Sequence, residues 1–379
     1  MSLIETAMDY LSVLKQRCRG VSFVMVLTLT AFLGFVVFSP LFITVFVLRL
    51  SSARWIIDTV ISTWFALAVA AFELLYGVKV VVNGDVSNID KYCSSLIIMN
   101  HRTRLDWLFY FAVQARYSTL RRFKISLKDE LRHAPGAGWA MQAKQFLFLK
   151  RNWDLDKIRI ETSLKHFQCV NYYPQLLFFP EGTDFTPYTR NKSKQYAKKN
   201  DLPEYEYVLH PRTTGFTSVF GYMKLYNNLK QVIDVTIAYP QNILQNESDL
   251  LNGNIPREIV FTVKTYKASE LPDTSDNDLV IWLEGRWREK ENFLKTFYEH
   301  KQQTDDNNYD FNQNLDIERD LILYSIGAIL FWAFVTIVTV WCLLFYTYFR
   351  WTFLSLSVIN LIISTCTGFD SLFTSLSVM

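Results

Sequence analysis

The chain has 379 residues, which allows one domain of two to three hundred residues plus additional segments. Half of the residues are hydrophobic and 16% are aromatic, more than an ordinary soluble protein carries. The formal net charge of +3 does not favour nucleic-acid binding. The five cysteines form no CxxC or Cys/His spacing, so we expect a reduced protein that binds no metal.

Two apolar stretches near the N-terminus predict membrane attachment. The first, Val21–Leu48, exceeds the roughly 20 residues needed to span a bilayer, and we expect Pro40 to kink it. It is too long for the core of a signal peptide and lacks a small-residue cleavage site, so we assign it to the mature protein. The second stretch, Trp55–Tyr76, follows after a short connector. Residues 1–76 are therefore predicted to form a hairpin that either spans the bilayer or dips into one leaflet.

Residues 77–300 have a globular composition, in which apolar runs of strand length alternate with helix-like stretches. This alternation predicts an α/β domain with a mainly parallel sheet and helices on both faces. The predicted strands are Leu96–Met99, Phe123–Leu127, Phe146–Leu149, Leu176–Phe179, Val235–Ala238 and Ile259–Val263. The predicted helices are Leu105–Tyr117, Trp139–Lys144, Leu155–Cys169 and an amphipathic closing helix, Leu279–His300.

The remaining residues resume the membrane pattern. Residues 301–320 are predicted to be a linker, because Thr304–Asn314 is polar, acidic and without periodicity. Two further apolar stretches, Leu321–Phe349 and Trp351–Ile363, are separated by Arg350. They predict a second membrane hairpin within residues 321–379.

The segment NHRTRLDW, residues 100–107, holds the first candidate site. Asn100, His101 and Asp106 follow a predicted strand, at the carboxyl end where open α/β sheets bind ligands. Positions i and i+5 lie on different faces of a helix, so the two side chains meet only if the turn folds back. Asp106 can then accept a hydrogen bond from one imidazole nitrogen and leave the other as a base. Taken singly, such a histidine is usually structural and such an aspartate is usually a helix cap.

Lys150 and Arg151 end another predicted strand. The planar fork of an arginine matches the oxygens of a phosphate, although two basic residues at a strand end are commonly only a solvated edge.

The strand before Pro180 leads to Glu181, Gly182 and Thr183. A carboxylate there can accept hydrogen bonds from the hydroxyls of a polyol, and a glycine lets the backbone approach a ligand closely. Pro and Gly also make ordinary β-turns. Pro211 lies in a fourth segment, HPRTTGF, which alone predicts a turn and a glycine-containing element.

In this order and at these intervals the four segments resemble the glycerolipid (lysophospholipid) acyltransferase family. Residues 100–106 are similar to its NHx4D catalytic block, F-x-x-R ending at Arg151 to the second block, FPEGT at 179–183 to the third, and Pro211 to the fourth. The resemblance covers about the middle two-thirds of the chain and points to the lysocardiolipin acyltransferase-like branch, which also acts on lysophosphatidylinositol.

Two positions depart from the family pattern. The third block usually continues with Arg where this chain has Asp184, and the second often has Gly where this chain has Gln145. The loss of a cation beside a lipid phosphate fits acceptors with larger head groups better than it fits lysophosphatidate.

The resemblance implies a glycerol-3-phosphate acyltransferase-like fold and a membrane-bound acyl-CoA:lysophospholipid acyltransferase. His101 would be the general base and Asp106 would orient it. Acyl-CoA would be a co-substrate, with no bound cofactor and no metal. We expect an integral protein of the endoplasmic reticulum, with its catalytic domain facing the cytosol, where acyl-CoA is supplied. The residues implied in substrate binding are Asn100, Lys150, Arg151, Glu181, Gly182, Thr183 and Pro211.

Several alternatives stay open at this point. The enzyme could be a 1-acylglycerol-3-phosphate acyltransferase of phosphatidic acid synthesis. It could be a catalytically silent membrane scaffold, or a lipid hydrolase that uses the His/Asp pair to activate water. A metal phosphoesterase fits less well, because His133, His166 and His210 stand on separate elements without ligand spacing.

Overall fold

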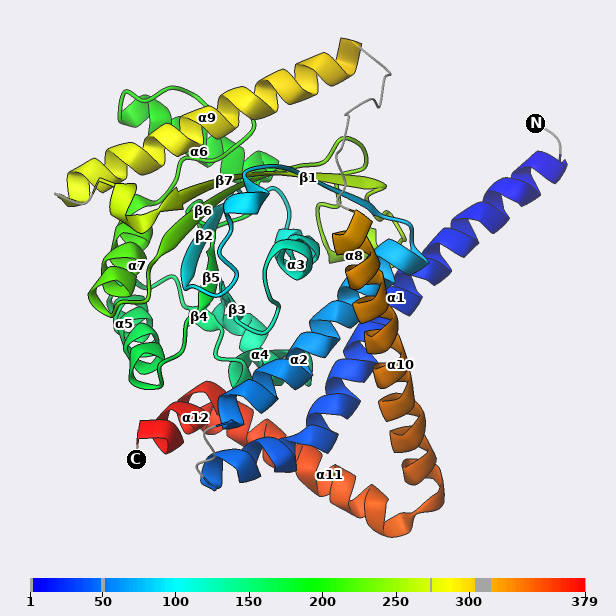
Figure 1. Ribbon diagram of the computed structural model, residues 1–379. Helices are drawn as coiled ribbons and strands as arrows, with labels where there is room; N and C mark the ends of the chain where they lie inside the picture. The colour runs from blue at the N-terminus through cyan, green and yellow to red at the C-terminus, as the bar shows by residue number, and fades with distance from the viewer. Residues whose placement is uncertain (1–2, 49–51, 273–274, 304–314, 379) are drawn as a thin grey trace.

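The computed structural model describes residues 3–48, 52–272, 275–303 and 315–378, so the predicted linker segment Thr304–Asn314 lies outside the described residues. The centre of the described chain is a seven-stranded sheet with the order β1-β7-β6-β2-β5-β3-β4 (Figure 1). All strand pairs are parallel except β6 with β7. The strands are β1 (Lys79–Gly84), β2 (Ser95–Met99), β3 (Phe123–Lys128), β4 (Leu147–Leu149), β5 (Gln175–Phe178), β6 (Gln231–Ala238) and β7 (Glu258–Lys267).

The predicted α/β class with a mainly parallel sheet is confirmed, and each of the six predicted strands is present to within about four residues at either end. The sequence interpretation missed β1. Its apolar run, Val80–Val82, is only three residues long and follows closely on a long apolar helix, so it was not recognised as a separate strand. β1 lies at the edge of the sheet and pairs with β7.

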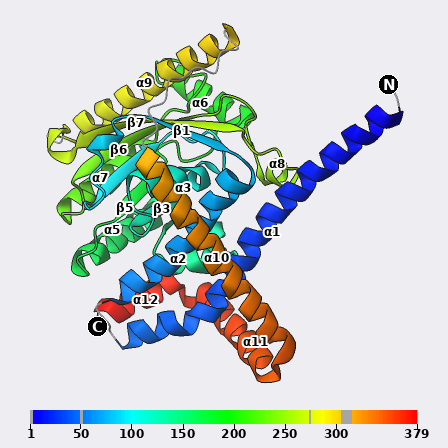
Figure 2. The same cartoon turned by 45° about the vertical axis from the view of Figure 1, so that its right-hand side comes forward.

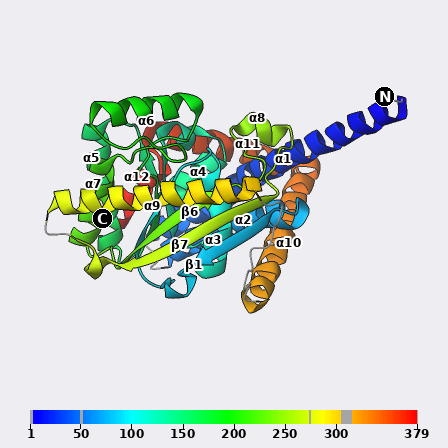
Figure 3. The ribbon, with the colours of Figure 1, turned by 90° about the horizontal axis from the view of Figure 1, so that it is seen from above.

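Both faces of the sheet are covered, because successive strand residues point to opposite sides. Ile97 packs into a core shared with α1 (Leu3–Val47), α2 (Ala53–Ala70), α3 (Asp106–Tyr117) and α4 (Ala137–Ala143). Ile98 packs into a second core with α5 (Trp153–Cys169), α7 (Thr213–Leu225) and α9 (Asp276–Gln303). Figure 3 shows α9 crossing the molecule beside the sheet. The helices of this domain are α3 (Asp106–Tyr117), α4 (Ala137–Ala143), α5 (Trp153–Cys169), α6 (Pro187–Lys199), α7 (Thr213–Leu225), α8 (Glu247–Leu251) and α9 (Asp276–Gln303).

The N-terminal hairpin consists of α1 (Leu3–Val47) and α2 (Ala53–Ala70), and a short π-helix, Ala71–Leu75, continues α2. Figures 1 and 2 show the two helices running side by side in opposite directions. Pro40 lies inside α1, which continues past it to Val47. The helix begins at Leu3, well before the predicted apolar stretch Val21–Leu48.

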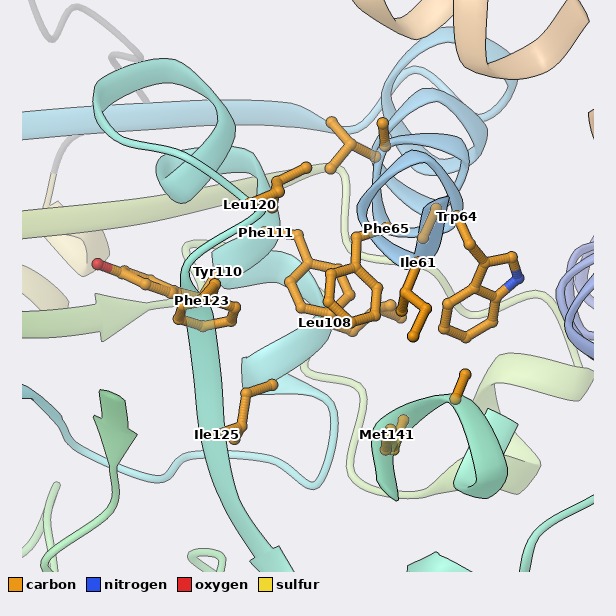
Figure 4. Close-up of a cluster of buried hydrophobic side chains, with 14 of the residues drawn as sticks. Ile61, Trp64, Phe65, Leu108, Tyr110, Phe111, Leu120, Phe123, Ile125 and Met141 are labelled. Carbon is orange, nitrogen blue, oxygen red and sulfur yellow. The ribbon is translucent and has the colours of Figure 1, made fainter. Parts of the chain in front are cut away.

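α2 is largely an interior helix of the protein, because 72% of its apolar window is buried. Its aromatic side chains face α3, β3 and α4 (Figure 4), and the rings of Phe65 and Phe111 stack with centroids 4.3 Å apart. Near its start, the fully buried Asp58 pairs with Arg54 at 2.8 Å and with Lys124 at 3.1 Å. A buried carboxylate needs such partners, so α2 is fixed to the sheet by charge as well as by packing.

The C-terminal segments are α10 (Leu315–Phe345) and α11 (Thr347–Ile362), followed by a π-helical turn and α12 (Phe369–Val378). The break between α10 and α11 lies at Tyr346, which has extended φ and ψ angles, and not at Arg350, which lies inside α11. The prediction of a break at Arg350 was wrong because a charged residue on an exposed helix surface does not end a helix.

α12 docks on the α/β domain. The backbone N–H of Phe369 donates to Gln142 Oε1 at 2.9 Å, and Gln142 Nε2 donates to Ser364 Oγ at 2.8 Å. Arg132 and Asp370 form an ion pair at 2.9 Å. The C-terminal segment thereby holds α4 and the turn that precedes it.

Four helices in the described ranges are long and apolar enough to cross a membrane. Only 22% and 17% of the apolar windows in the last two are buried, so most of their side chains are available to lipid. This agrees with the predicted membrane attachment. The four segments are Tyr10–Val47, Ala53–Leu75, Ile317–Phe345 and Thr347–Thr367.

Arg116 of α3 joins both hairpins to the domain, because its guanidinium, 5% exposed, bonds Glu73 at 2.7 and 2.9 Å and Glu318 at 2.8 and 3.0 Å. Removing one partner of a buried ion pair costs about 3–5 kcal/mol. We therefore expect Arg116→Met to lower the unfolding free energy by about 3 kcal/mol, measured by denaturation in detergent. Arg319→Met, at an exposed position, is the control, and equal stability of the two variants would contradict this role.

Candidate active site

His101 and Asp106 meet at the carboxyl end of β2, as the sequence predicted. The chain leaves β2 in the His101 turn, residues 100–105, and Asp106 opens α3. His101 Nδ1 lies 3.0 Å from Asp106 Oδ2. The imidazole also stacks on Phe179, with ring centroids 4.2 Å apart. The side chain of His101 is 16% exposed, so a reactant can reach it, whereas that of Asp106 is fully buried.

Asp106 is held by three further hydrogen bonds. The backbone N–H of Thr103 donates to Oδ2 at 2.9 Å, and the Thr103 hydroxyl donates to Oδ1 at 3.0 Å. The hydroxyl of Tyr239, directly after β6, donates to Oδ1 at 2.6 Å. Burial and the adjacent Asp106 charge raise the pKa of Tyr239 well above its usual value, so the phenol remains a donor. The carboxylate is therefore fixed in the orientation that faces the imidazole.

Glu181 links the His101 turn to a second turn, residues 179–184, which we call the Glu181 turn. Glu181 Oε1 accepts from the backbone N–H of His101 at 3.3 Å and from the indole N–H of Trp287 in α9 at 3.2 Å. The other carboxyl oxygen, Oε2, is buried without a hydrogen-bond partner in the described chain. Burial raises the pKa of Glu181 to about 7, against the opposing effects of His101, Trp287 and the backbone of Leu209.

Gly182 adopts a φ of +71°, which glycine allows at little cost. A Cβ atom here would lie 3.1 Å from Cδ of Arg212, so the arginine side chain packs directly over the glycine. The backbone N–H of Arg212 donates to the carbonyl of Pro180 at 2.7 Å. The third and fourth sequence segments therefore lie side by side, which brings the buried Pro211 and the half-buried Thr183 to the same edge as His101.

The side chain of Asn100 is 1% exposed and bridges β2 to β6. Its Nδ2 donates to the carbonyl of Ile237 at 3.2 Å, and its Oδ1 accepts from the N–H of Ile237 at 2.8 Å. Asn100 therefore continues the sheet beyond the last residue of β2 and sets the start of the His101 turn.

Lys150 and Arg151 follow β4, at the same edge of the sheet as His101, and both are exposed. Strands β5 and β3 lie between β2 and β4, which places Arg151 about 14 Å along the edge at ordinary strand spacing. Arg151 has a φ of +61°, and the backbone N–H of Lys150 donates to Asp156 Oδ1 at 2.7 Å. Arg212, in contrast, packs directly on the Glu181 turn.

Several residues of this site were not predicted from the sequence. Thr103 lies within the NHx4D segment, where its position between His101 and Asp106 was the available signal. Arg212 follows Pro211 in the fourth segment, and that position was the available signal. Tyr239 and Trp287 come from distant elements that carry no local motif.

Comparisons with known proteins agree with this geometry. A family model described as Acyltransferase matches residues 81–239, and one described as Acyltransferase C-terminus matches residues 249–318. Lysocardiolipin acyltransferase 1 of Gallus gallus is 42% identical over 341 residues, covering 90% of this chain and 89% of that protein. The chain therefore belongs to the glycerolipid (lysophospholipid) acyltransferase family.

Further relatives support the lysocardiolipin acyltransferase-like branch of that family. Lysocardiolipin acyltransferase 1 of Danio rerio is 47% identical over 281 residues, which cover 74% of this chain and 72% of that protein. Lysophosphatidylinositol acyltransferase 10 of Caenorhabditis elegans is 40% identical over 252 residues, covering 66% and 64%. These similarities place the chain among the lysophospholipid acyltransferases.

The Tyr239 hydroxyl should matter for turnover more than for binding, because it orients Asp106 and touches no part of the exposed imidazole. A hydrogen bond to a charged group contributes about 1.5–3 kcal/mol, so we expect Tyr239→Phe to lower kcat about tenfold or more, with KM little changed. Steady-state acyl transfer measures this. Tyr92→Phe, at an exposed site, is the control, and an unchanged kcat in Tyr239→Phe would refute the orienting role.

Glu181 should make stability depend on pH. Its pKa is raised in the folded protein to about 7, so between its ordinary value near 4.5 and pH 7 the folded state binds more protons than the unfolded state. The stabilisation is therefore complete below about pH 4.5 and is lost as the pH rises through about 7. We expect the unfolding free energy of wild type, relative to Glu181→Gln, to fall between pH 5 and 8. If the unfolding free energies of the two proteins instead changed in parallel from pH 5 to 8, Glu181 would be ionised over that whole range.

Proposed function

We propose that this protein is a membrane-bound acyl-CoA:lysophospholipid acyltransferase that remodels the acyl chains of phospholipids. It moves an acyl chain from acyl-CoA to a free glycerol hydroxyl of lysocardiolipin, lysophosphatidylinositol or a similar anionic lysolipid. The observation that carries the proposal is the His101–Asp106 pair, at 3.0 Å, at the carboxyl edge of the sheet. The names of the relatives support the acceptor class.

The pair supplies a general base. When Nδ1–H of His101 donates to Asp106, Nε2 carries the free lone pair and can take the proton of the acceptor hydroxyl. That oxygen attacks the thioester carbonyl, the new C–O ester bond forms, and the C–S bond breaks. The proton on Nε2 passes to the departing thiolate, which leaves as coenzyme A. The acceptor hydroxyl takes the place of an enzyme serine, so the transfer is direct.

The surrounding groups keep the imidazole ready for this step. Asp106 stabilises the imidazolium that forms, and its own hydrogen bonds to Thr103 and Tyr239 prevent it from rotating away. Phe179 covers one face of the ring. Glu181 holds the backbone of His101, and Arg212, together with Arg151 farther along the edge, offers cationic groups to the phosphate of the acceptor.

Membrane attachment suits this reaction, because acceptor and product both reside in a bilayer. Extracting an acyl chain into water costs about 0.8 kcal/mol per CH₂ group, which a site held at the interface avoids. The lipid-facing side chains of α10 and α11 would hold the domain there. We place the protein in the endoplasmic reticulum with the domain on the cytosolic side, where acyl-CoA is supplied.

Replacing the base should abolish transfer without unfolding the protein. A general base contributes about a hundred- to ten-thousandfold, so we expect His101→Ala to lose at least a hundredfold in kcat. The measurement is transfer from labelled oleoyl-CoA to a panel of lysophospholipids by purified protein in detergent, with the melting temperature of each variant. His133→Ala, at an exposed position, is the control.

Three results would contradict the proposal. Equal kcat of wild type and His101→Ala would show that His101 is not the base. A covalent acyl-protein trapped in a single turnover with labelled acyl-CoA would replace direct transfer with a two-step scheme. Release of free fatty acid in place of a phospholipid product would identify a hydrolase.

A further inference from the structure

A cleft of about 440 Å³, lined mostly by polar residues, opens beside the His101 turn. Its walls come from the His101 turn, the Glu181 turn, the start of α6 and the loop before α8. The backbone N–H of Phe185, in the cleft wall, donates to the carbonyl of His101 at 2.8 Å, so the cleft lies next to the turn that carries His101. The polar side chains in its lining include those of Arg102, Arg104, Asp184, Arg190, Gln245 and Asn246.

Asp184 is the one carboxylate in this lining. Its Oδ2 lies 3.4 Å from Nε of Arg104, and its side chain is 15% exposed, so it faces the cleft but is sheltered from bulk water. Arg104 is 55% exposed and can move toward a ligand. Arg102 is more constrained. Its guanidinium donates to the backbone carbonyl of Phe185 at 3.2 Å, and its Cζ lies 4.9 Å from the centroid of the Phe185 ring.

This mixture of groups suits a hydroxylated head group joined through a phosphodiester. A carboxylate only accepts hydrogen bonds, whereas arginines donate them and amides do both, so the lining can satisfy hydroxyls together with one phosphate charge. The volume lies within the range of about 300–1,000 Å³ found for small-molecule sites. A phosphate monoester carries about −1.5 to −2 charges at pH 7, and next to Asp184 it meets a like charge.

We infer that this cleft binds the head group of the acyl acceptor, and that Asp184 selects lysophospholipids with a hydroxylated phosphodiester head group over those that end in a phosphate monoester. This inference rests on the proposed acyltransferase function and adds the residue that decides between its acceptors. Asp184 accepts hydrogen bonds from head-group hydroxyls, and its charge, only partly neutralised by Arg104, repels a dianion.

The test compares kcat/KM for lysophosphatidylinositol and lysophosphatidate with the same acyl chain, using the full-length protein and one acyl-CoA. We expect wild type to prefer lysophosphatidylinositol. Asp184→Asn should lower the ratio of the two kcat/KM values about tenfold, and Asp184→Arg should lower it further, since like-charge contacts across an interface cost several kcal/mol. Gln245→Ala, in the part of the lining that precedes α8, should reduce transfer to lysophosphatidylinositol while leaving transfer to lysophosphatidate unchanged.

Asp201→Asn is the matched control, because it also removes one negative charge, at an exposed position outside the cleft lining. Asp201 has a φ of +53°, a backbone conformation that asparagine tolerates. An unchanged acceptor ratio in both Asp184 variants would overturn the inference and leave the acyltransferase function standing. A changed KM for acyl-CoA with an unchanged acceptor ratio would also overturn it, by assigning the cleft to the phosphates of coenzyme A. Wild type that transfers to no acceptor would instead refute the proposed function.

Discussion

The buried carboxylate of Asp106 is the constraint around which the active site is built. A charge without access to water is tolerated only where hydrogen bonds replace its hydration. Those bonds come from Thr103, from the imidazole of His101 and from Tyr239, which is 133 positions away. The turn after β2 and the end of β6 therefore have to be in register before the charge is satisfied. Stability of the domain and orientation of the His101 imidazole are two results of the same contacts.

The parallel sheet brings the remaining groups to this place. Parallel strands deliver their following turns to one edge, so the His101 turn, the Glu181 turn and the turn after β4 share an edge although they are far apart in sequence. Glu181 and Asn100 then join neighbouring turns and strands through side chains rather than through the backbone ladder. On one face of the sheet, α2 packs as an interior helix, which ties the membrane hairpin to the domain that carries the chemistry.

Local patterns were enough to predict much of this arrangement. The His101–Asp106 pair was predictable because a strand, a turn and a helix start within eight residues determine where both side chains lie. Tyr239 and Trp287 were not predictable, since each reaches the site through pairing between distant elements and neither belongs to a distinctive motif. Arg212 belongs to the fourth segment, but its contact with Gly182 depends on the packing of two turns that are distant in sequence. β1 was hidden because its apolar run is short and follows closely on the preceding apolar helix. The break at Tyr346 was missed because charge, rather than backbone conformation, was taken as the sign of a helix end.

The docking of α12 has a consequence for the order in which the protein assembles. Phe369 bonds to Gln142 across 227 positions of sequence, and Asp370 pairs with Arg132 across 238. The sheet can form from the middle of the chain alone, but α4 acquires these partners only after two further apolar helices have been synthesised and placed. Completion of the domain therefore depends on the placement of α10 and α11, which connect it to α12. A chain whose last helices are misplaced would retain an incompletely packed α4 at the edge that leads to Arg151.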